Sequence, residues 1–205
     1  MRVSRTVLAV LSFVALALAG AVPAAAQSET APSAQSAPPP KEHKGDKFTE
    51  NEVVQAASGF FGATSEAVAK VVQKIFSDNG LPDGYIKGDE GSGAFVVGLR
   101  YGSGWLIRKG YAPVKVYWQG PSVGFDFGGN ASKAFMLVYG LSRRDRLYQR
   151  FPGVNGSFYF IAGIGVNYVR ADDITIAPMR TGVGLRAGVN AGYLTFTREQ
   201  TWNPF

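Results

Sequence analysis

Residues 122–128 read Ser-Val-Gly-Phe-Asp-Phe-Gly, and every second residue is large and apolar. Val123, Phe125 and Phe127 fall on one side of an extended chain, and the small or polar residues between them fall on the other. This alternation predicts a β-strand with one buried face. A second long strand is predicted at 157–169, where alternate apolar residues share a side: Phe158, Phe160, Ile164, Val166 and Tyr168.

Glycine accompanies this alternation through the C-terminal part of the chain. All but four of the 26 glycines lie from Gly80 onward, which disfavours helices there. Glycine also weakens a strand unless the sheet bends sharply or two backbones approach closely. We therefore predict a mainly β fold, a small soluble antiparallel β-barrel of roughly eight to ten strands. Further strands are expected at 93–101, 104–109, 114–118, 133–140, 173–178, 180–188 and 190–198, with a tight connection at 101–104.

Two helices are predicted before the strands. Thr49 and Glu52 have the spacing of a capping box, so a short helix should follow and end near Gly59. A second helix should run from Thr64 or Ser65 to Asp78, before the stop signal Asn79-Gly80. Its apolar residues form one face: Val68, Val71, Val72, Ile75 and Phe76. We expect this amphipathic helix to pack in or on the barrel, the alternative being that it lies on a membrane.

The N-terminal residues have the pattern of an export signal. Arg2 and Arg5 precede the apolar run 7–19, and three alanines at 24–26 supply the small residues of a cleavage site. A cleaved signal peptide is predicted at 1–26; the alternative, a membrane anchor, needs about 20 apolar residues and is marginal on length. Residues 27–47, rich in Ala, Ser, Pro and Gln, predict a disordered linker, which leaves 48–205 for the folded domain.

The composition restricts the chemistry. The chain has no cysteine and a single histidine, His43, which lies in the predicted linker. A disulfide or a cysteine metal site is therefore impossible, and a histidine-based catalytic triad in the folded domain is not expected. We expect no cofactor, no metal and no enzymatic activity. The formal net charge of +6 suits contact with anionic lipid or polysaccharide, and it also fits an ordinary soluble protein.

The most suggestive polar segment contains Arg143, Arg144, Arg146 and Arg150, close to aromatic residues. Guanidinium groups bind phosphate through paired hydrogen bonds, so these arginines are the candidate ligand-binding residues. The ligand would be an envelope lipid, lipopolysaccharide or a cell-wall component. The alternative is an ordinary solvated loop between strands.

Asp126 is the one carboxylate within an apolar strand pattern. An inward orientation would raise its pKa or require a buried partner. We favour an outward, solubilising orientation, because the Val–Phe side of its strand is the natural core. Asp172 and Asp173 are interpreted as a hairpin turn. A carboxylate-dependent hydrolase would require these acids to face one cleft.

Two resemblances to known families follow from longer stretches. Residues 104–108, 119–128 and 134–138 resemble the core of SYLF lipid-binding domains. The wider run 84–205, including 151–156 and the ending Thr-Trp-Asn-Pro-Phe at 201–205, resembles the EipA family of alphaproteobacterial periplasmic proteins. This second resemblance implies a soluble β-barrel with an associated helix, a periplasmic location and a role in cell-envelope integrity, without a known reaction.

The predicted function is therefore that of a non-catalytic periplasmic protein that supports envelope integrity by binding an envelope component. Membrane association would be peripheral at most, and no nucleic-acid partner is expected in that compartment. One alternative is a scaffolding module that contacts envelope proteins through sheet edges or the helix. Others are the hydrolase and an outer-membrane barrel, the latter disfavoured by Pro204 beside Phe205 and by short predicted strands.

Overall fold

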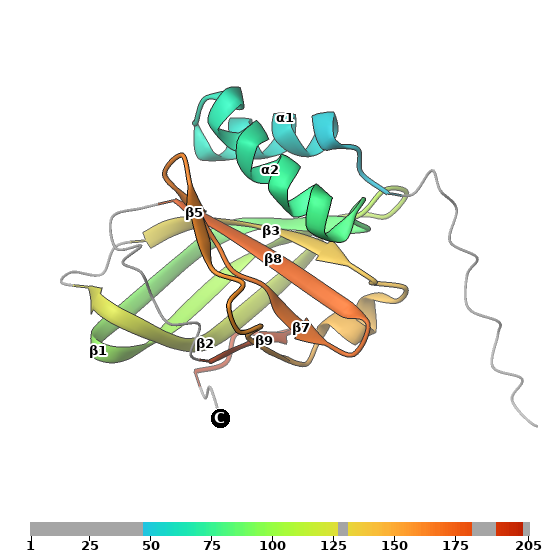
Figure 1. Ribbon diagram of the computed structural model, residues 1–205. Coiled ribbons are helices and arrows are strands. Elements are labelled where there is room, and N and C mark those ends of the chain that lie inside the picture. Colours follow the sequence, from blue (N-terminus) through green and yellow to red (C-terminus); the bar gives the residue numbers. More distant parts are fainter. Residues whose placement is uncertain (1–46, 127–130, 182–191, 203–205) are drawn as a thin grey trace, which may run out of the picture. The chain divides into compact units, whose positions relative to one another are not determined.

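The computed structural model describes residues 47–126, 131–181 and 192–202, excluding the side chains of 92–98, 122–126 and 131. Two helices precede nine strands in these ranges, and the helices lie across one face of a curled sheet (Figure 1). The predicted signal peptide and all but the last residue of the predicted linker lie outside them. No helix in the described ranges combines the length and apolar character needed to cross a membrane.

Helix α1 (Glu50–Phe61) begins at the predicted capping box. The Thr49 side chain accepts a hydrogen bond from the Glu52 backbone amide at 3.4 Å, and the Glu52 carboxylate accepts one from the Thr49 amide at 2.7 Å. The helix passes through Gly59 and ends at left-handed Gly62, later than predicted. A single glycine inside a helix costs only about 1 kcal/mol, which the packing of α1 overrides.

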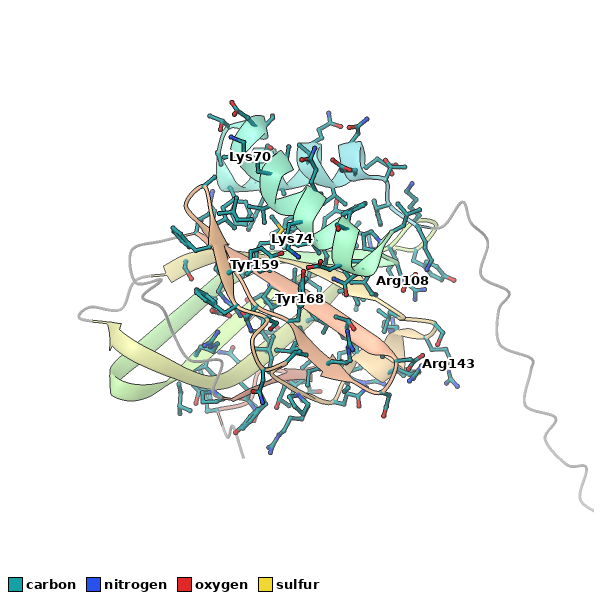
Figure 2. All side chains as sticks on the ribbon, viewed as in Figure 1. Lys70, Lys74, Arg108, Arg143, Tyr159 and Tyr168 are labelled. Atoms are coloured by element: carbon teal, nitrogen blue, oxygen red, sulfur yellow. The ribbon has the colours of Figure 1, made fainter. Side chains whose placement is uncertain are left out.

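Helix α2 (Ser65–Asn79) begins as predicted, with Thr64 as N-cap, and ends one residue later than predicted, before Gly80. Four residues of its predicted apolar face are fully buried against the sheet, Val68, Val71, Val72 and Ile75, and the fifth, Phe76, is partly buried. At its C-terminal end, the Tyr168 hydroxyl donates a 2.7 Å hydrogen bond to Asp78 and lies 3.2 Å from the Tyr159 hydroxyl (Figure 2). Burial raises the pKa of Tyr168, so this hydroxyl remains a donor.

The strands form one antiparallel sheet in the order β4-β9-β2-β1-β3-β8-β6-β5, with β7 also paired to β8. Their bounds are β1 (Gly84–Ile107), β2 (Val114–Asp126), β3 (Ala131–Tyr139), β4 (Arg150–Pro152), β5 (Tyr159–Ile161), β6 (Ile164–Val166), β7 (Val169–Ala171), β8 (Ile174–Thr181) and β9 (Tyr193–Thr197), and a short 3-10 helix, η2 (Arg144–Leu147), precedes β4. Gly153, next to β4, bridges Val169 of β7, and the Val154 amide donates to the Tyr168 carbonyl at 2.9 Å. These contacts join the chain next to β4, at one edge of the sheet, to β7, which pairs with β8. The sheet is therefore curled, which confirms the predicted antiparallel barrel with helices packed on it.

Strand β1 explains part of the glycine content. Its first half pairs with β3 and its second half with β2. The two halves also approach each other, because a Cβ atom on Gly88 would collide with the Ser103 backbone and one on Gly104 with the Lys87 carbonyl. Only glycine permits this backbone approach. The predicted connection at 101–104 is wrong, since these residues lie inside β1 opposite β2.

Two separate cores share β3. Phe135, Leu137 and Tyr139 face the helices, together with the buried faces of β6 and β8. Met136 and Val138 face the inside of the barrel, which is filled by side chains from six further strands and from the segment around η2. A strand buried on both faces ties the helices to the barrel.

The predicted strand at 157–169 is wrong. Ala162 and Gly163 adopt positive φ values of 50° and 85°, so the chain turns and β5 pairs with β6. Ile161 then lies opposite Ile164, and Phe160 falls on the other face and is 54% exposed. Strand β8 covers most of the predicted strand 173–178 and the start of the predicted strand 180–188 without a break between them. Residues 182–191 lie outside the described ranges.

Candidate functional site

Three of the predicted ligand-binding arginines, Arg143, Arg144 and Arg146, lie in or next to η2, where Arg143 points away from the barrel (Figure 2). The Arg146 guanidinium donates to both carboxylate oxygens of Asp173, at 2.9 Å for the longer bond. Asp172, the first residue of the turn between β7 and β8, lies 3.8 Å from the same guanidinium. This pairing lowers the pKa of Asp173 and raises that of Arg146.

A further carboxylate lies among these arginines. Asp145 accepts a 2.8 Å hydrogen bond from Arg198 and is 3.7 Å from Arg143. The Arg198 guanidinium also lies over the Tyr148 ring, 4.6 Å from its centre. Three acids, Asp145, Asp172 and Asp173, therefore balance much of the positive charge at η2. Two of them come from the turn between β7 and β8, a contact that the sequence alone did not predict.

Arg150, the fourth predicted arginine, belongs to a different surface. In β4 it alternates with Phe151, which is fully buried inside the barrel, so Arg150 lies on the outer face. Its guanidinium stacks on the Tyr193 ring with 4.1 Å between the guanidinium carbon and the ring centre. Such stacking keeps the charge near the surface while ordering the side chain.

The outer face of β1, β2, β9 and β4 lies on the side of the barrel away from α1 and α2 (Figure 1). We call it the aromatic–basic face, after the side chains that it carries: Tyr101, Trp105, Lys115, Tyr117, Arg150, Tyr193 and Trp202. Trp105 lies opposite Lys115 in the register, with the ammonium 5.4 Å from the indole centre, and Lys115 also lies 5.8 Å from the Tyr117 ring. Trp105 is 46% exposed.

The register aligns the two halves of this face. Tyr101 lies opposite Gln119, Gln119 opposite Thr195, and Thr195 opposite Arg150. Tyr101 also packs against Trp202 with the two rings tilted and 5.2 Å between their centres, and its hydroxyl donates to the Trp202 carbonyl at 3.0 Å. Trp202 is 68% exposed. A row of residues therefore crosses four strands from Tyr101 to Arg150. Aromatic rings lie at both of its ends, Trp202 beside Tyr101 and Tyr193 beside Arg150.

The positive charge of this face comes from Lys115 and Arg150. The stretch 91–125 contains no Asp or Glu, and of its basic residues Lys115 lies on the face, whereas Lys109 binds Glu52 of α1 at 2.8 Å. At the turn between β1 and β2, exposed Tyr111 lies 4.7 Å from the Arg108 guanidinium. The acid-free stretch is the sequence signal from which this surface could have been found, and our sequence reasoning did not use it.

Asp126, the other residue singled out from the sequence, is the last residue of β2 and lies opposite Ala94 in the register. Its side chain is outside the described part of the structure, so the predicted outward orientation stays a prediction. Asp172 and Asp173 lie in an exposed turn, where they contact Arg146.

Comparison with known proteins places the chain in a family. A crystal structure of a β-barrel-like, uncharacterized protein from Brucella abortus is similar to it, with 50% sequence identity and a TM-score of 0.71, over 78% of this chain and 99% of that one. No curated protein matches it. The family model described as envelope integrity protein A matches residues 46–205. The chain therefore belongs to the EipA family, whose name assigns it to the integrity of the cell envelope.

Proposed function

We propose that this protein is a non-catalytic periplasmic protein that supports envelope integrity by binding an anionic lipid or lipopolysaccharide through the aromatic–basic face. The family supplies the role in the envelope. The observation that carries the binding proposal is the cross-strand pair Trp105–Lys115, an exposed indole next to an ammonium on a sheet face that neither α1 nor α2 covers.

The chemistry of this face fits a headgroup layer. Tryptophan and tyrosine rings favour the boundary between water and apolar chains, because one end of each ring system is apolar and the other is polar. Lysine and arginine near an anionic surface each contribute about 1 kcal/mol of attraction. Lys115 and Arg150 both lie beside aromatic rings on this face, so charge and apolar contact would act at the same place.

The test is co-sedimentation of the purified protein with phosphatidylcholine vesicles, with and without added phosphatidylglycerol, and with lipopolysaccharide. We expect binding only when anionic lipid is present, and we expect it to weaken as NaCl is raised. The variant Lys115→Gln should bind about fivefold more weakly, following the energy of one surface charge, and adding Trp105→Ser should weaken binding further.

The control is Lys70→Gln, which removes an exposed ammonium from the opposite, helix-covered side. It should bind like the unchanged protein. The combined variant Arg143→Ala, Arg144→Ala and Arg146→Ala tests the arginines of η2 separately. Binding lost in that variant and retained in Lys115→Gln would move the site to η2. Absence of binding to both anionic surfaces would refute the proposal.

A second function, protein scaffolding, is supported by the end of the sheet. Strand β5 is the last strand in the order, and it carries Phe160, which is 54% exposed. An edge strand with an exposed aromatic residue offers backbone pairing and an apolar contact to a partner protein. A photo-crosslinking residue at position 160 in intact cells should then give discrete protein adducts. If no adducts form at position 160, this alternative is excluded.

A further inference from the structure

A charged cluster is buried inside the barrel. Glu90 of β1 and Arg180 of β8 are only 4% and 8% exposed. The Arg180 Nε donates to one carboxylate oxygen of Glu90 at 2.8 Å, and a terminal nitrogen donates to the other at 3.2 Å. The second terminal nitrogen donates to the Asn167 side-chain oxygen at 2.9 Å. Arg180 therefore satisfies Glu90 with a two-pronged ion pair.

A third charged side chain approaches this pair. In the second half of β1, Arg100 donates from Nε to the Pro121 carbonyl at 3.1 Å, and one terminal nitrogen lies 3.9 Å from a Glu90 oxygen. That distance is too long for a hydrogen bond. The Arg100 side chain is 25% exposed, whereas Glu90 is almost completely enclosed. Arg100 is therefore the most solvent-exposed of the three charged side chains.

The charges within the described part of the chain do not balance. Two guanidinium groups face one carboxylate, and Arg180 already occupies both of its oxygens. Burial, together with the positive charge of Arg180, lowers the pKa of Arg100 to about 10 although Glu90 opposes the shift. Burial alone would raise the pKa of Glu90, and the two arginines outweigh it and hold that pKa below its usual value. An uncompensated buried charge is costly, and a bound anion removes that cost.

We propose that Arg100 and Arg180 form an anion-binding site, at the solvent-exposed end of this cluster, that takes a phosphate group. Guanidinium groups match the oxygens of a phosphate, and Arg100 has one terminal nitrogen 3.9 Å from Glu90 while its Nε is held by a backbone carbonyl. The phosphate could be free or part of a phospholipid headgroup. This site is distinct from the aromatic–basic face and does not depend on binding there.

Thermal unfolding of the full protein tests the proposal. Inorganic phosphate is compared with NaCl at the same ionic strength. A second comparison uses a water-soluble short-chain phosphatidic acid, which carries the phosphate as a lipid headgroup. We expect phosphate to raise Tm by roughly 3 °C once its concentration exceeds Kd about tenfold. A larger rise with phosphatidic acid would identify the headgroup as the source, and equal rises would identify free phosphate as sufficient.

Two variants of Arg100 separate binding from folding. Arg100→Gln removes the surplus charge, so its Tm without phosphate should equal or exceed that of the unchanged protein, and the phosphate-dependent rise should disappear. Arg100→Lys keeps the charge but removes the paired N–H donors of the guanidinium. It should therefore need about tenfold more phosphate for the same rise in Tm. Lys87→Gln, an exposed position on the outer face of the same strand, should respond like the unchanged protein.

Either of two results would overturn the proposal. One is a Tm that rises no more with phosphate than with NaCl, which would leave the cluster as an internal ion-pair network only. The other is a phosphate-dependent rise that persists unchanged in both Arg100 variants. The Lys115→Gln variant should keep the full phosphate response, so failure at the outer face and failure at the inner site are distinguishable.

Discussion

The indole N–H of Trp118 donates a 2.8 Å hydrogen bond to a carboxylate oxygen of Glu90. Trp118 lies on β2 directly opposite Gly102 of β1, and the indole extends across that glycine to reach the first half of β1. A side chain at position 102 would collide with the ring. The aromatic ring thus covers a glycine in the sheet while its polar end holds the only carboxylate among the described side chains of the buried cluster.

Replacing Trp118 with Phe should destabilise the protein by about 1–3 kcal/mol. The substitution removes the donor and leaves a buried carboxylate oxygen with fewer partners, which is the costly way to lose a hydrogen bond. Urea unfolding followed by circular dichroism measures the change. The control is Trp105→Phe on the exposed face, which should change the stability by less than about 0.5 kcal/mol. Equal effects of the two variants would contradict the role of the Trp118–Glu90 bond.

Glu90→Gln should cost roughly 3–5 kcal/mol at neutral pH, because it leaves the buried Arg180 and the partly buried Arg100 without their carboxylate. The two arginines hold the pKa of Glu90 below its value in an unfolded chain, although burial opposes them. The stabilisation is therefore complete above an ordinary glutamate pKa of about 4.3 and is lost as the pH falls through the folded-state value.

A pH series of urea unfolding checks this expectation. The difference in unfolding free energy between the unchanged protein and Glu90→Gln should shrink as the solution becomes more acidic. A difference that stays constant from neutral to acidic pH would show that the charge of Glu90 does not stabilise the barrel.

Gly88→Ala should prevent stable folding or lower the stability by about 3 kcal/mol or more, because its Cβ would collide with backbone atoms of Ser103 and Gly104, which cannot rotate away. Gly91→Ala is the matched control on the same strand, since a Cβ there would meet nothing within 4 Å. Thermal unfolding of both variants gives the comparison. A loss in Gly91→Ala as large as that in Gly88→Ala would attribute the effect to β1 in general.

Thr49→Ala should destabilise the protein by about 1 kcal/mol through loss of the N-cap. Hydrogen bonds from Lys109 and then from Thr49 lower the pKa of Glu52 to about 2. The contribution of Glu52 is thus complete above about 4.3 and declines as the pH falls toward 2. Because Glu52 is exposed, this pH effect should be small and weakened by salt.

Unfolding of Glu52→Gln over the same pH series checks the assignment, with Glu50→Gln as the control in the same helical turn. Glu50→Gln should retain the acid-dependent loss of stability that Glu52 provides. If Glu50→Gln also removed the acid-dependent loss of stability, that loss could not be assigned to Glu52.

Local patterns of the sequence were sufficient for both helices and for the class of the sheet. The capping box at Thr49 and the stop at Gly80 act within a few residues, so they are readable without tertiary information. The strand at 157–169 was misread because a turn of two residues leaves the alternation of period two undisturbed on both sides. The left-handed conformations at Ala162 and Gly163 appear only in the structure.

The sequence by itself determined a glycine-rich antiparallel barrel with capped helices, because periodicity, capping and glycine content are local properties of the chain. The tertiary structure decided which distant residues meet: Arg146 with the turn at Asp173, Lys115 with Trp105, and Glu90 with Arg180. Those contacts depend on strand order and register, which are fixed by the curling of the whole sheet. The same curling brings apolar side chains together to fill the interior. Among the described residues, it also places two guanidinium groups, those of Arg100 and Arg180, beside the single carboxylate of Glu90.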